Sequence, residues 1–158
     1  MEDLTPNGAT APVRKRPKAL LWIIAIVGIA LTAGMAIFQM KSTPMDYNYN
    51  LYLATKAFNL ACPRMIDGET RLDSVSARYD KIYTYNYTLV SYAKKDLDTD
   101  VFCEEWETGI IGGLKGNKEM EEFGKNGVTL VFRIRDKTLD SLCTVTLFPE
   151  AYYTPSAN

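Results

Sequence analysis

The residues best suited to chemistry in this sequence are three cysteines, Cys62, Cys103 and Cys143. A nucleophilic cysteine usually relies on a histidine as its base, and the chain of 158 residues contains no histidine. We therefore expect structural roles for these thiols. Three cysteines allow three single-disulfide pairings. We prefer Cys62 with Cys103, because one follows a predicted helix and the other begins the next. Free thiols that pack as small apolar side chains are the alternative.

A group of acidic residues in the middle of the chain could in principle hold calcium, which prefers six to eight oxygen ligands. The group comprises Asp96, Asp98, Asp100, Glu104, Glu105 and Glu107. A helix is predicted to begin within it, and carboxylates are favoured near a helix N-terminus by the helix dipole. The sequence thus favours capping and solvation, and we expect no metal and no cofactor.

The glycine-rich stretch GIIGGLKG, residues 109–116, could suggest a phosphate-binding loop. Such a loop needs a strand before it and a helix opening from it. Here the preceding residues are predicted to be helical, so these glycines indicate a helix break or hinge instead.

Tyrosines and two arginines form the remaining candidate site. The tyrosines are Tyr79, Tyr83, Tyr85, Tyr87 and Tyr92, and the arginines are Arg133 and Arg135. Tyrosine is favoured in strands, so most of these rings should pack in the core or at a sheet edge. Tyrosine is also enriched at interfaces, so Tyr83, Tyr85, Tyr87, Arg133 and Arg135 are a possible partner surface. The arginines otherwise belong to a solvated face.

The elements that must position these residues follow from hydrophobic periodicity. Helices are predicted over 50–61, from Asp98 onward with a buried stripe, and over 118–123 with Gly124 as the left-handed cap. The stripe consists of Val101, Phe102, Trp106 and Ile110. Strands are predicted over 71–78, 82–92, 128–135 and 141–148. The order αββαββ predicts an α+β domain over 47–153, with one antiparallel sheet covered by helices on one face.

An uncharged, mostly apolar run of 22 residues over 19–40 precedes this domain. As a helix it would span roughly 33 Å, enough for the hydrocarbon core of a bilayer. Four basic residues crowd into 14–18, so the positive-inside rule places the tail 1–18 in the cytoplasm and the domain outside. We therefore predict a single transmembrane helix in the inner (plasma) membrane, a tether over 41–46 and a frayed end over 154–158. A cleaved signal peptide with a site at 34–36 is the rival interpretation.

The stretch CPRMIDGETRLDSV (62–75), followed by TYNYTLV (84–90), resembles a pattern in small uncharacterised bacterial envelope proteins. The resemblance implies an extracytoplasmic setting and brings no activity or site residues.

Charge and composition narrow the possible functions further. The part after residue 18 is mildly acidic, which argues against nucleic-acid binding. We expect a membrane-anchored interaction or accessory module without catalysis, with the bilayer and an envelope protein as partners. A membrane-tethered sensor or binder of a small ligand is the alternative.

Overall fold

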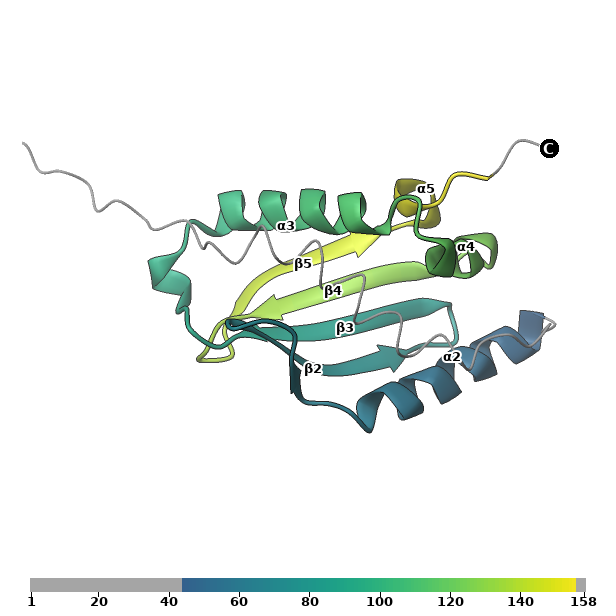
Figure 1. The fold of residues 1–158 in the computed structure, drawn as a ribbon, viewed down its shortest axis with the longest axis horizontal. Coiled ribbons are helices and arrows are strands. Elements are labelled where there is room, and N and C mark those ends of the chain that lie inside the picture. The colour runs from purple at the N-terminus through teal and green to yellow at the C-terminus, as the bar shows by residue number, and fades with distance from the viewer. Residues whose placement is uncertain (1–43, 156–158) are drawn as a thin grey trace, which may run out of the picture.

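A computed structural model describes residues 44–155 as one α+β domain (Figure 1). Its helices are α2 (Pro44–Asn59), the short 3-10 turn η1 (Lys94–Asp96), α3 (Thr99–Leu114), α4 (Lys118–Lys125) and α5 (Pro149–Tyr152). Its strands are β1 (Arg64–Met65), β2 (Thr70–Ala77), β3 (Ile82–Leu89), β4 (Thr129–Arg135) and β5 (Ser141–Leu147). The predicted tail 1–18 and transmembrane segment 19–40 lie outside the described residues, as do residues 41–43 of the tether and the last three residues. Residues 44–46, predicted as tether, belong to α2. Among the helices of the described part, none is long and apolar enough to cross a membrane.

The five strands form one sheet in the order β1-β2-β3-β4-β5. Three neighbouring pairs are antiparallel, but β3 and β4 run parallel, with Tyr85 opposite Phe132. The prediction of an antiparallel sheet is therefore wrong, and the sheet is mixed. The connection through α3 and α4 is long enough to carry the chain back to the end where β3 began, which parallel pairing requires. The four longer strands themselves lie close to their predicted ranges.

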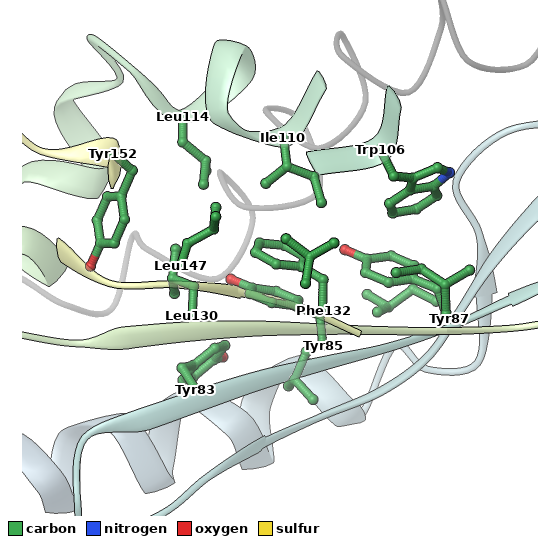
Figure 2. Close-up of a cluster of buried hydrophobic side chains, with 14 of the residues drawn as sticks. Tyr83, Tyr85, Tyr87, Trp106, Ile110, Leu114, Leu130, Phe132, Leu147 and Tyr152 are labelled. Carbon is green, nitrogen blue, oxygen red and sulfur yellow. The ribbon is translucent and has the colours of Figure 1, made fainter. Parts of the chain in front are cut away.

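One face of the sheet carries the core, and the helices cover it. The side chains of β3 that point to this face meet their register partners on β4, where Tyr83 pairs with Leu130 and Tyr87 with Ile134. Figure 2 shows the tyrosine rings beneath Trp106, Ile110 and Leu114 of α3. On the other face, residues of β4 and β5 are exposed, namely Arg133, Arg135, Thr144 and Thr146. The expectation of one covered and one wet face therefore holds for β4 and β5, whereas Thr84 and Thr88 on the same face of β3 are buried.

Helix α3 buries one stripe along its whole length. Phe102, Trp106, Ile110 and Leu114 are spaced by four residues and all are buried. Val101, which we expected in the stripe, is 41% exposed because it precedes the buried face by one position. The glycines at 109, 112 and 113 do not break the helix, contrary to the sequence prediction. The tertiary contact of the stripe outweighs their low helix propensity, and the chain turns only at Gly116, where φ is +75°.

The end of α4 differs from the prediction in one detail. Gly124 is inside the helix, and the left-handed conformation belongs to Gly127, where φ is +69°. Gly124 is needed for space: a Cβ built there would lie 2.3 Å from Cβ and Cγ of Tyr153. The glycine therefore allows the last turn of the chain to pack against α4.

Candidate partner-binding site

The three tyrosines predicted as part of a partner surface are core residues. Tyr83, Tyr85 and Tyr87 are only 2–3% exposed. Tyr85 stacks on Phe132 with ring centroids 5.2 Å apart, and Tyr87 tilts against Trp106 at 5.7 Å (Figure 2). Burial raises the pKa of all three phenols above the usual value. They stay neutral and are unavailable to a partner, which agrees with the packing interpretation and corrects the surface interpretation.

The two arginines lie on the opposite face of the sheet. Arg133 and Arg135 are exposed, next to Thr144 and Ser141 of β5 in the strand register. They therefore do not join the tyrosines in one site. Their position matches the solvated face that the alternation of β4 indicates.

A buried carboxylate, that of Asp136, lies directly after the end of β4. The carboxylate of Asp136 is 1% exposed and accepts hydrogen bonds from the N–H groups of Lys94 (2.7 Å), Thr138 (2.8 Å) and Asp140 (2.9 Å). Burial alone would raise the pKa of Asp136, but these bonds and that of the Thr138 hydroxyl lower it to about 2. An anion this well satisfied is a structural clamp between two loops, not a reactive group. Among the described residues, those near α3 included, no group of three or more metal-ligating side chains comes together.

The most distinctive surface feature is a small pocket between α2 and the β2–β3 turn. Its volume is about 190 Å³, and we call it the tyrosine pocket. Its lining residues are Asn48, Tyr49, Tyr52, Ala77, Arg78 and Tyr79. The three tyrosines are 60%, 46% and 92% exposed, respectively. Large aromatic side chains in a concave and exposed position are typical of binding surfaces rather than of core packing.

Helix α2 is fixed firmly enough to hold its half of the pocket. Leu51 is fully buried beneath the helix, and the Tyr47 hydroxyl donates to the Glu122 carbonyl of α4 at 3.3 Å. At the other end, Asn59 Nδ2 donates to the Val75 carbonyl and Val75 N–H donates to Asn59 Oδ1, both at 2.8 Å. With its buried side held in this way, α2 turns Tyr49 and Tyr52 outward.

The β2–β3 turn holds the other half of the pocket. Lys81 adopts a positive φ of 58°, and its ammonium donates to the Asn126 carbonyl at 2.8 Å. Arg78 pairs with Asp80 at 3.1 Å. These contacts hold the turn in place, and the side chain of Tyr79 at its tip is exposed.

Asn48, a lining residue, has a side-chain oxygen without a hydrogen-bond partner among the described residues. Asn48 Oδ1 is buried, yet no hydrogen bond to it is found among the described residues. A buried acceptor without a donor is costly, on the order of 1–3 kcal/mol, so the amide of Asn48 is a weak point in the packing of α2 beside the pocket. The exposed tyrosines of the tyrosine pocket suit an apolar or aromatic group of a partner.

Sequence reasoning identified only part of this site. Tyr79 was among the candidate aromatic residues, but Asn48 and Tyr49 were placed before the predicted helix 50–61. The helix begins instead at Pro44, and the segment 47–52 then turns Tyr49 and Tyr52 outward while Tyr47 and Leu51 are buried. Helical spacing from Pro44, the residue type preferred at a helix start, could have revealed this.

The cysteines are arranged differently from the preferred pairing. Cys103 lies against β5, where its thiol contacts the Leu142 carbonyl at 3.7 Å and the Cys143 thiol. Cys62 lies before β1, beside Arg64 and Asp73. All three are thiols in the structure.

Comparison with known proteins shows the fold but not the family. No protein-family model matches the chain, and no curated protein matches it in sequence. Three solved structures share the fold. A predicted secreted protein of Pseudomonas aeruginosa has a TM-score of 0.59 at 10% identity, covering 72% of this chain and 100% of its own. The type II secretion system pilotin AspS of Vibrio cholerae has a TM-score of 0.51 at 9% identity, covering 77% and 98%. The type 2 secretion system pilotin EpsS of Vibrio vulnificus has a TM-score of 0.54 at 8% identity, covering 71% and 97%. At these identities the likeness concerns architecture alone.

Proposed function

We propose that this chain is an extracytoplasmic accessory module of the cell envelope that binds a partner protein through its tyrosine pocket, without a catalytic step. The segment 19–40, as the sequence predicts, attaches it to the inner membrane. The observation that carries the proposal is the pocket itself, which is lined by three exposed tyrosines.

The fold and the pocket support the proposal independently. Two of the structural neighbours are pilotins of type II secretion systems, and a third is described as secreted. An envelope setting also agrees with the basic cluster before residue 19 and the acidic body after it. Neither of these arguments depends on the shape of the pocket.

The size of the pocket favours a protein partner over a small ligand. Sites for drug-sized molecules usually have volumes of about 300–1,000 Å³, and this pocket measures about 190 Å³. That is room for a single side chain of a partner, with the surrounding tyrosines as the rim. At the tyrosine pocket, a small ligand is therefore the weaker candidate.

Site-specific photo-crosslinking in living cells tests the proposal. A photoreactive phenylalanine analogue replaces Tyr79 in the full-length chain, and a matched chain carries it at Val101. Val101 is also exposed, at 41%, but lies at the first turn of α3, far along the sheet from the pocket (Figure 1). We expect one discrete adduct with an envelope protein from position 79 and none of that size from position 101.

Two further variants show whether the adduct depends on the pocket. Tyr52→Ala and Asn48→Leu, each combined with the analogue at position 79, should reduce the adduct several-fold while the chain stays folded. An adduct of equal yield from positions 79 and 101, or one that both variants leave unchanged, would refute the tyrosine pocket as the binding site. A thermal shift with a metabolite, lost in the same variants, would favour the small-ligand alternative instead.

A further inference from the structure

Two of the cysteines meet where α3 packs on β5. Cys103 occupies the second turn of α3, and Cys143 is in the middle of β5, opposite Ile134 of β4. The Cys103 thiol reaches the carbonyl of Leu142, the residue next to Cys143, at 3.7 Å, and hydrogen-bonds with the Cys143 thiol. Both side chains are partly buried against the core. The fold thus brings together two thiols separated by 40 positions in the sequence.

Cys62 lies near the opposite edge of the sheet. It precedes β1, which is hydrogen-bonded to β2, whereas Cys143 belongs to β5, at the other edge. Neighbouring strands lie about 4.8 Å apart, so β2 and β5 are separated by roughly 14 Å. Disulfides need Cα atoms within about 7 Å. Neither Cys103 nor Cys143 can therefore pair with Cys62 unless the sheet is disrupted.

We infer that Cys103 and Cys143 form a disulfide in the exported protein and that Cys62 stays a thiol. The two thiols together give up two protons and two electrons, and an S–S bond forms between them. The electrons pass to a disulfide oxidant, such as oxidised glutathione or a thiol-disulfide oxidoreductase, whose own disulfide is cleaved to two thiols. The inference rests on the proposed extracytoplasmic location for its oxidising environment, and on the folded geometry for the choice of pair.

The bond would have a definite structural effect. It closes a loop that contains most of α3, all of α4 and all of β4. The α3–α4 part of this loop is the crossover that makes β3 and β4 parallel. Burial raises the pKa of the Cys143 thiol, with a further contribution from its hydrogen bond with Cys103. Little Cys143 thiolate is present at neutral pH in the folded chain, so we expect oxidation during folding to be faster than oxidation of the folded, reduced protein.

Refolding of the full-length chain in detergent micelles, in a buffer of reduced and oxidised glutathione, tests the choice of pair. Free thiols are then alkylated, the chain is unfolded and digested, and the peptides are weighed. We expect one alkylated cysteine, Cys62, and one linked pair of peptides that contains Cys103 and Cys143. The variant Cys62→Ser should give the same linked pair, and Cys143→Ser should give no intramolecular link. A linked peptide that contains Cys62, or three alkylated cysteines after refolding, would overturn the inference.

A second measurement separates this inference from the proposed location. Cells that express the full-length chain are treated with a membrane-permeable alkylating agent before lysis, and the same peptides are weighed. The linked pair in this sample supports both statements. The linked pair after glutathione refolding, together with three alkylated cysteines from cells, would support the geometry and overturn the extracytoplasmic location.

Discussion

The side chain of Asn59 gives the sharpest test of how this domain is held together. It completes the edge of β2 where no strand of the described residues pairs with it, because β1 covers only Arg71 and Leu72 of that strand. Its amide donates to the Val75 carbonyl and accepts from the Val75 N–H, both at 2.8 Å, so it imitates the pairing of a neighbouring strand. Replacement by alanine removes both bonds and leaves two backbone groups of β2 without a protein partner.

The expected cost follows from these two bonds. A hydrogen bond contributes about 1 kcal/mol net to stability, and the loss of two from a partly buried strand should cost about 2 kcal/mol or slightly more. For a domain of about 100 residues this lowers the melting temperature by roughly 10 °C. Thermal and urea unfolding of the full-length chain in detergent, followed by circular dichroism, would measure it.

Asn126 supplies the matched control. Its amide also donates to a backbone carbonyl, that of Glu122 at 2.8 Å, but at an exposed position where water can replace it. Asn126→Ala should therefore cost less than about 0.5 kcal/mol. Equal losses from Asn59→Ala and Asn126→Ala, or no loss from the former, would show that the strand edge does not depend on Asn59.

Three other predictions use the same unfolding assay or a simple fractionation. Gly124→Ala should destabilise the domain by about 1–3 kcal/mol, because the new Cβ collides with Tyr153. Gly112→Ala in α3, whose new Cβ meets nothing within 4 Å, should stabilise the domain by up to about 1 kcal/mol. Changes of the same sign in the free energy of unfolding of the two variants would contradict the packing. The pKa of Asp136 is lowered from the ordinary value of 3.8 to about 2 in the fold, so its contribution to stability should be complete above about pH 4 and lost as the pH falls towards 2. Asp136→Asn should remove that part of the pH dependence of the free energy of unfolding. An unchanged pH dependence in this variant would count against the clamp. If 19–40 is an uncleaved anchor, the full-length chain should stay in the membrane pellet after alkaline carbonate washing, and a soluble chain that begins near residue 37 would indicate a signal peptide instead.

Local patterns predicted the elements well because each one carries its own periodicity. The alternation in β3 identified both the strand and the face on which Tyr83, Tyr85 and Tyr87 lie. The spacing of Phe102, Trp106 and Ile110 identified the buried stripe of α3 even though glycines interrupt it. In both cases the burial of one face dominates over the intrinsic preference of single residues.

Relations between distant elements could not be read in the same way. Nothing in the residues of β3 or β4 says whether the two strands run parallel, since that depends on where the α3–α4 connection returns. The partner of Cys103 was missed for the same reason: proximity in sequence to helix ends suggested Cys62, while the packing of α3 on β5 puts Cys143 beside it. Gly124 was assigned to the left-handed cap, but Tyr153, from the distant end of the chain, needs the space there, and the left-handed conformation belongs to Gly127.

Helix α2 connects the stability of the sheet to the proposed binding site. An uncovered strand edge is open to pairing with other chains, and proteins usually protect such edges. Here α2 protects the edge of β2 through Asn59, and the same placement sets Tyr49 and Tyr52 opposite Tyr79. The two halves of the tyrosine pocket therefore keep their spacing only while α2 stays on β2. Loosening that contact with Asn59→Ala should weaken crosslinking from position 79 at temperatures where the domain is still folded, whereas Asn126→Ala should not. Unchanged crosslinking in the Asn59 variant would mean that the partner binds the β2–β3 turn alone.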